Sequence, residues 1–136
     1  MEPNSSEVKF KILVVDDSEC IREVLIILLS RRGHRCESAT NGIEAVEKVR
    51  ESDFDAVVTD LQMPEMDGIG LTRELHQHFC DLPVMIMTGQ PDESLAESAT
   101  RAGAREILEK PFEISDFMVR LHRMLHDQEP VLEERT

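Results

Sequence analysis

The sequence has few basic residues for its size. Its 136 residues include 15 Lys and Arg against 28 Asp and Glu, which gives a formal net charge of −13 at pH 7. Binding to a phosphate backbone requires clustered Lys and Arg, and Arg31, Arg32 and Lys110 form no such stripe. The composition therefore argues against nucleic acid as a direct partner.

Long apolar runs are also missing. No run approaches the roughly 20 residues that a helix needs to span a bilayer. The first residues, 1–7, are polar and lack the apolar core of a signal peptide. We therefore expect a cytoplasmic protein without a membrane partner, whose residues 1–7 form a flexible lead-in.

Motifs for several common kinds of site are absent. Cys20, Cys36 and Cys80 are odd in number and lack the spacing of metal ligands, so we expect reduced and mostly packed thiols. The sequence Gly68-Ile69-Gly70 lacks the third glycine of a dinucleotide-binding motif, and no Walker lysine motif occurs. The five histidines are scattered, and we interpret all of them as surface residues rather than phosphorelay histidines. They are His34, His76, His78, His122 and His126.

Length and patterning predict one domain. At 136 residues the chain can bury a substantial core, and 40% hydrophobic with 32% charged residues is ordinary for a globular protein. No internal repeat or low-complexity segment occurs. We expect the domain to cover residues 8–126, with the polar and acidic residues 127–136 forming a frayed tail or the start of a linker.

Apolar runs alternate with segments of helical spacing along the chain. This alternation predicts a parallel sheet with helices on both faces, and right-handed crossovers restrict its topology. We predict a flavodoxin-like (βα)5 α/β fold with a five-stranded sheet in the order 2-1-3-4-5. The expected strands are 10–15, 35–39, 56–59, 84–87 and 106–109. The expected helices are 19–32, 43–51, 68–79, 92–102 and 114–126.

The predicted helix over 92–102 differs from the others because it has few large apolar residues. Leu95 is its largest, and the remaining apolar positions are alanines. Pro91 suits its first turn. A helix that buries little apolar surface is held loosely, so we expect this one to be the most mobile.

Polar side chains stand at the ends of four predicted strands. Asp16 and Asp17 follow the first strand, Asp60 the third, Thr88 the fourth and Lys110 the fifth. Chemistry in open α/β sheets collects at the carboxyl ends of the strands. In the predicted order the first and third strands are neighbours, so the three aspartates should meet in one crevice.

Three close carboxylates repel one another. At about 4 Å and an effective dielectric constant of about 20, each pair costs about 4 kcal/mol, which protons or a cation must offset. An all-oxygen site suits Mg²⁺. The alternative interpretation is that Asp16 and Asp17 merely cap the following helix.

In this order and strand context, the five positions make the sequence resemble the receiver domain of two-component response regulators. The resemblance covers roughly residues 8–126. It implies that Asp60 is the phosphoacceptor and acts as a carboxylate nucleophile. The phosphoryl group would come from a histidine kinase or a histidine phosphotransfer protein. It also implies that Mg²⁺ is bound by Asp17, Asp60 and the backbone carbonyl of Gln62, with Asp16 acting through a water.

The resemblance assigns further roles around the phosphoryl group. The Lys110 ammonium and the Thr88 hydroxyl would contact phosphoryl oxygens, and the Lys110–Pro111 peptide bond would be cis. Gly89 would leave room for the phosphodonor. Gln62 and Gln90 would border the site, near the hydrolytic water.

One position departs from the family pattern. Receivers usually carry Tyr or Phe three residues before the lysine, whereas this chain has Ile107, a β-branched residue with few χ1 options. We expect phosphorylation to pull Thr88 inward and to shift the helix over 92–102, while Ile107 packs passively. The responding surface would also include 106–109 and 114–126 and would control a partner, an effector domain or a phosphorylation-linked dimer.

Two other functions compete with this interpretation. A small aspartyl-phosphate phosphatase of the haloacid-dehalogenase type would need an acid two residues after Asp60, where Gln62 stands, and a cap domain. An inactive receiver-like interaction domain is the other, and the complete acidic pocket argues against it. We therefore expect no enzyme activity beyond autocatalytic phosphorylation and dephosphorylation of Asp60.

Overall fold

The structure is a computed structural model that describes residues 10–89 and 92–126. The expectations for a lead-in at 1–7, for Gln90 and Pro91 and for a tail at 127–136 lie outside the described residues. Within the described chain, no helix is both long and apolar enough to cross a membrane.

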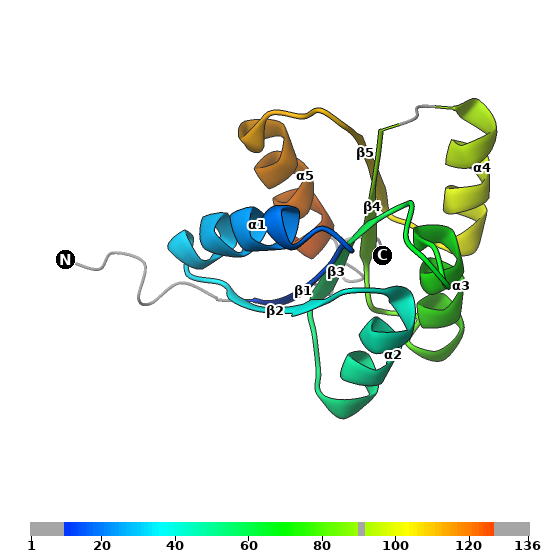
Figure 1. The fold of residues 1–136 in the computed structure, drawn as a ribbon, viewed down its shortest axis with the longest axis horizontal. Coiled ribbons are helices and arrows are strands. Elements are labelled where there is room, and N and C mark those ends of the chain that lie inside the picture. Colours follow the sequence, from blue (N-terminus) through cyan, green and yellow to red (C-terminus); the bar gives the residue numbers. More distant parts are fainter. Residues whose placement is uncertain (1–9, 90–91, 127–136) are drawn as a thin grey trace, which may run out of the picture.

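Five strands and five helices alternate along the chain (Figure 1). The strands are β1 (Lys11–Val15), β2 (Arg35–Ala39), β3 (Ala56–Asp60), β4 (Val84–Thr88) and β5 (Glu106–Glu109). The helices are α1 (Glu19–Arg31), α2 (Gly42–Glu51), α3 (Gly68–His78), α4 (Glu93–Ala102) and α5 (Ile114–His126). The strands form one parallel sheet in the order β2-β1-β3-β4-β5, which confirms the predicted fold.

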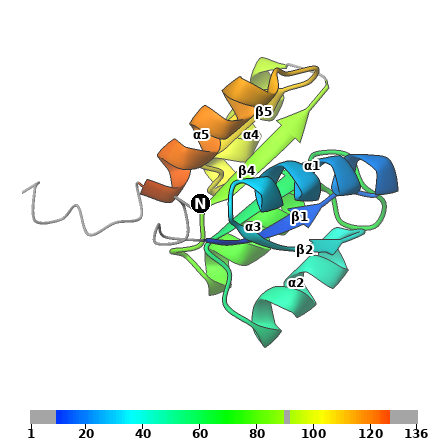
Figure 2. The same ribbon diagram turned by 90° about the vertical axis from the view of Figure 1, so that its left-hand side faces the viewer.

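The helices cover both faces of the sheet. Helices α1 and α5 pack on one face, and α2, α3 and α4 pack on the other (Figures 1 and 2). The side chains of β3 and β4 are buried at every position, as expected of strands covered on both faces. The edge strand β2 is more exposed, as its mixed sequence predicts.

Element ends agree with the expected bounds to within a residue. Asn41 and Asp92 prove to be N-caps, accepting hydrogen bonds from the backbone N–H groups of Glu44 and Ser94. Helix α2 therefore begins at Gly42 rather than Ile43. Short polar side chains favour the cap position because they satisfy N–H groups that the helix leaves unpaired.

Burial differs from expectation at several positions. His34, expected at the surface, is buried and lies 5.8 Å from the Phe10 ring, centroid to centroid. Cys20 and Cys80, expected to be packed, are exposed, and only Cys36 is partly covered. These differences depend on contacts between segments far apart in sequence, which the local pattern does not contain.

Helices α4 and α5 flank β5 but bury very different surfaces. Helix α5 buries five large side chains, whereas α4 buries only Ala99 and Ala102. Ile114, the first residue of α5, is exposed, whereas Phe117 and Met124 are buried. The weak apolar face predicted for α4 is present.

Candidate functional site

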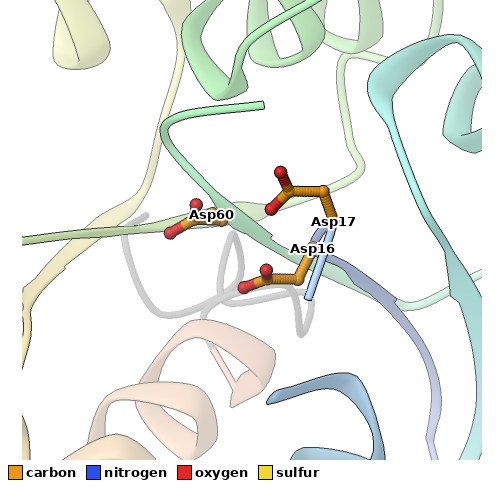
Figure 3. Close-up of side chains that lie close together, drawn as sticks. All are labelled: Asp16, Asp17 and Asp60. Carbon is orange, nitrogen blue, oxygen red and sulfur yellow. The ribbon is translucent and has the colours of Figure 1, made fainter. Parts of the chain in front are cut away.

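The three aspartates lie together at the carboxyl edge of the sheet (Figure 3). Strands β1 and β3 are neighbours, and Val15 pairs with Thr59. The residues that follow this pair, Asp16 and Asp60, are therefore brought to the same place. One carboxylate oxygen from each of Asp16, Asp17 and Asp60 lies within 4.8 Å of the others. Asp16 and Asp60 are buried, while Asp17 is exposed.

Asp16 is held from several directions. Its Oδ1 accepts a hydrogen bond from the Ser18 N–H at 2.9 Å, and its backbone N–H donates to the Ala39 carbonyl. Arg22 Nη1 donates to the Asp16 carbonyl at 2.7 Å. The buried Oδ2 of Asp16 has no hydrogen-bond partner. Burial raises the pKa of Asp16, and the neighbouring Asp60 charge adds to this effect.

Lys110 reaches into the acidic cluster from the end of β5. Its Nζ lies 2.7 Å from Asp60 Oδ1 and 4.0 Å from Asp16 Oδ2. The Lys110 backbone N–H donates to the Thr88 carbonyl at 2.7 Å, which ties the ends of β4 and β5 together. The Lys110–Pro111 peptide bond is cis. An ammonium group here partly offsets the negative charge of the three carboxylates.

Thr88 and Gln62 lie at the same edge. Thr88 is the buried last residue of β4, next to Met87, which pairs with Asp60. Gln62 is exposed in the loop that follows Asp60. Gly89 has open space around it, because a Cβ added there would meet no atom within 4 Å. Every described residue singled out by the sequence for this site therefore belongs to one edge of the sheet.

Two residues that support the site, Gly68 and Arg22, were not predicted from the sequence. A Cβ on Gly68 would lie 2.5 Å from the backbone oxygen of Asp60, so only glycine permits this approach. In the sequence, Gly68 stood out only as the start of the predicted helix over 68–79 and as part of an incomplete glycine motif. Arg22 gave no signal, because its contact with the Asp16 carbonyl depends on how α1 packs over the loop.

The donor set fits a hard divalent cation. All of its side-chain ligands are carboxylate oxygens, and one buried oxygen, Asp16 Oδ2, lacks a hydrogen-bond donor. Mg²⁺ prefers oxygen ligands and binds through one or two carboxylates while keeping several waters. The cluster is therefore compatible with Mg²⁺.

Known proteins share this sequence pattern and fold. The family model described as the response regulator receiver domain matches residues 12–122. The chain is 36% identical over 120 residues to the response regulator MprA of Mycobacterium sp. (strain KMS), covering 88% of this chain and 52% of that protein. MprA of Mycobacterium leprae (strain TN) is also 36% identical, with 53% of its length covered. The chain thus spans about half the length of these curated relatives.

Solved structures agree with the sequence relatives. A response regulator receiver domain protein from Clostridium thermocellum superposes with a TM-score of 0.84 at 29% identity, covering 90% of this chain and 98% of that one. The chemotaxis protein CheY4 of Vibrio cholerae gives 0.82 at 28% identity, covering 86% and 99%. With the family model matching most of its length, the chain belongs to the response regulator receiver domains of two-component systems.

Proposed function

We propose that Asp60 accepts a phosphoryl group from a phosphohistidine of a histidine kinase or histidine phosphotransfer protein. The observation that carries this proposal is the 2.7 Å contact between Lys110 Nζ and Asp60 Oδ1 inside the aspartate cluster. A carboxylate that contacts an ammonium group and lies beside two more acids supports a functional role for this cluster, because such concentrations of charge are typical of functional sites.

The reaction is a direct transfer. A carboxylate oxygen of Asp60 attacks phosphorus, the new O–P bond forms, and the N–P bond of the phosphohistidine breaks with its electron pair leaving on the imidazole nitrogen. Phosphoryl transfer depends on positioning and on neutralisation of charge more than on covalent help. Lys110 supplies one positive charge at the phosphoryl oxygens, and the Thr88 hydroxyl donates a hydrogen bond to another oxygen.

A divalent cation completes the charge balance. Asp17, Asp60 and the backbone carbonyl of Gln62 would hold Mg²⁺, with Asp16 contributing through a water. When bound, Mg²⁺ neutralises charge on the phosphoryl oxygens. Asp16 Oδ2 is buried without a hydrogen-bond partner, so a nearby cation or a water bound to it would stabilise this oxygen.

The output would be a change on the surface formed by α4, β5 and α5, which controls a partner or an effector domain. Thr88 moves toward the phosphoryl group and α4 shifts, because α4 buries only two alanines. Ile107 packs passively. Reversing a 1:99 equilibrium would require about 5.5 kcal/mol of preference, so phosphorylation alone produces a partial shift that a partner completes.

Labelling with acetyl phosphate tests the phosphoacceptor. We expect a hydroxylamine-labile phosphoryl group on Asp60 only when Mg²⁺ is present, detected by mass spectrometry. Asp60→Asn should abolish it, and Asp53→Asn, an exposed aspartate away from the site, should not. Labelling of another residue in Asp60→Asn would refute the assignment.

The proposed output has a separate test. Beryllium fluoride with Mg²⁺ mimics the phosphoryl group, and amide NMR shifts should then change in α4 and β5 more than in α1. Changes in α1 with none in α4 would overturn the proposed mechanism.

A further inference from the structure

A cavity of about 390 Å³ lies between α4 and the sheet. Its apolar lining includes Ile86 on β4, Leu95 and Ala99 on α4, and Ile107 on β5. The inner face of α4 carries small alanine side chains, and Ile107 on β5 is only partly buried, so space remains between the helix and the sheet. The cavity opens to solvent on one side, and its volume leaves room for a large side chain from outside the domain.

The mouth of the cavity is acidic. Asp92, Glu93 and Glu109 line it together with the apolar residues, and all three are exposed. Asp92 is partly engaged as the N-cap of α4, since its Oδ1 accepts from the Ser94 N–H. Among the described residues that line this cavity none is basic. An apolar interior with an acidic rim selects an apolar group attached to a positive charge.

We propose that this cavity receives an aromatic or leucine-sized side chain of a basic partner segment, whose adjacent Lys or Arg lies against Glu93 and Glu109. The volume falls at the small end of the range of about 300–1,000 Å³ for ligand pockets, which suits side-chain insertion. Interfaces commonly gain most of their energy from one such buried anchor. The proposal rests on the proposed function in assigning output to α4 and β5, and it adds the chemistry of the partner.

Charge argues against two other occupants. A second copy that met this one symmetrically at the same cavity would bring two acidic rims together, and like-charge contact disfavours such association. Residues 127–136 of the chain carry Asp127, Glu129, Glu133 and Glu134 against one arginine, so they do not complement the rim either. A basic partner segment matches both the rim and the net charge of −13.

The cavity touches the site through one residue. Thr88 lines the cavity and ends β4 at the edge where Asp60 lies, and it pairs across the sheet with Glu109 on the rim. A movement of Thr88 changes the cavity, and an occupant of the cavity acts back on Thr88 with equal coupling free energy.

Small peptide probes can test the anchor directly. We would titrate the unphosphorylated, Mg²⁺-free protein with N-acetyl-Phe-Arg-amide and follow methyl NMR shifts of Ile86, Leu95, Ala99 and Ile107. Shifts at these methyls with millimolar affinity are expected. N-acetyl-Ala-Arg-amide, which lacks the ring, and N-acetyl-Phe-Glu-amide, which reverses the charge, should bind at least fivefold more weakly.

Matched variants locate the binding. Ala99→Leu fills the cavity and should abolish the methyl shifts. The surface variant Glu93→Gln/Glu109→Gln, which leaves the packing of α4 intact, should lower affinity for the Phe-Arg probe about fivefold, as the loss of two exposed ion pairs predicts. Glu97→Gln, an exposed α4 residue that does not line this cavity, should have no effect.

Several results would overturn the proposal. Equal binding of the Phe-Arg and Phe-Glu probes, undiminished binding to the charge variant, or no methyl shifts at all would each do so. Acetyl phosphate should still label Asp60 in the charge variant. Failure of that labelling in the wild-type protein would refute the proposed function and leave the cavity result standing, so the two failures are distinguishable.

Discussion

Helices α4 and α5 stand on opposite faces of the same strand, and they are attached to it in different ways. Helix α5 is fixed by large side chains, among them Phe117 and Leu121, which are fully buried. Helix α4 contributes only two alanines to the core and leaves a cavity beneath it. The same strand therefore has one neighbour packed through large side chains and one packed through alanines. Under the proposed function, this asymmetry would let the α4 side respond to the site while the α5 side maintains the fold.

Truncation of one side chain in each helix should give the largest contrast. Leu121→Ala in α5 should lower the free energy of unfolding by about 2–5 kcal/mol, because it leaves a cavity in a closed core. Leu95→Ala in α4 should cost about 1 kcal/mol, since Leu95 already borders a void and is partly exposed. Urea unfolding measures both, and Val119→Ala, exposed on α5, is the control. Equal costs for the two leucines would contradict the comparison.

Amide hydrogen exchange should sharpen the contrast without mutation. We expect the amides of α4 to exchange through local openings that cost at least about 2 kcal/mol less than the openings of α5. Helix α3 packs on the same face as α4 but buries Leu71 and Leu75, so it serves as the internal control. If α3 exchanges as fast as α4, the whole face is loose and the alanines of α4 are not the reason.

Asp16, at the carboxyl edge, should affect stability independently of either helix. Its pKa is raised by burial, so the folded protein holds this proton more tightly than the unfolded chain. Its contribution to stability therefore falls as the pH rises above about 3.8 toward the raised pKa. Asp16→Asn should raise the free energy of unfolding by about 1 kcal/mol at neutral pH without Mg²⁺.

The control for Asp16 is Asp17→Asn, which changes an exposed carboxylate of the same cluster. Unfolding is measured from pH 4 to pH 7, and the difference between Asp16→Asn and wild type should grow with pH. A constant difference across this range would mean that the carboxylate is not destabilised by its burial.

On the face of the sheet covered by α1 and α5, His34 should make stability depend on pH to a smaller extent. Its Nδ1 accepts a hydrogen bond from the Phe10 N–H at 3.4 Å, and its ring meets His122 of α5 edge to face. Burial lowers the pKa of His34, with His122 and Arg32 adding to the effect. Unfolded chains then bind more protons, so stability is lost as the pH falls below about 6.5.

Replacing the histidine isolates this effect. His34→Asn keeps a hydrogen-bond acceptor near the position of Nδ1, but the asparagine does not titrate. The free energy of unfolding of this variant should therefore fall less between pH 7 and pH 5.5 than that of the wild-type protein. His76→Asn, at an exposed position on α3, is the control. An identical fall in His34→Asn and wild type would exclude His34 as the source.

Sequence patterns predicted the fold and the location of the site because both depend on order along the chain. Apolar runs identified β1, β3 and β4, and the polar residues after the strands identified the edge where Asp16, Asp60 and Lys110 meet. Their chemical roles follow from the family resemblance and stay predictions. The weak apolar face of α4 was also visible, since it requires only the positions of the alanines.

Features that depend on contacts between distant segments were not predictable. The burial of His34 requires α5 to pack against the start of β2. The Arg22 contact spans only six residues, but it depends on the conformation of a long side chain, which the sequence pattern does not contain. The cavity under α4 depends on how far the side chains of the helix and of the sheet extend toward each other. This distance is evident only when both elements are in place.

The close approach at Gly68 also sets the length of a loop. The Gly68 N–H donates to the Leu61 carbonyl at 2.7 Å, so residues 61–68 form a closed ring beside the Asp60 carbonyl. Because a backbone hydrogen bond joins the two ends of this loop, the number of residues between them is constrained. Insertions and deletions between Leu61 and Gly68 should therefore be excluded even where substitutions in the exposed part of the loop are tolerated. For protein engineering, this segment fixes the number of residues between Asp60 and the start of α3. A design that transfers Asp60 to another scaffold should therefore keep residues 61–68 at their full length.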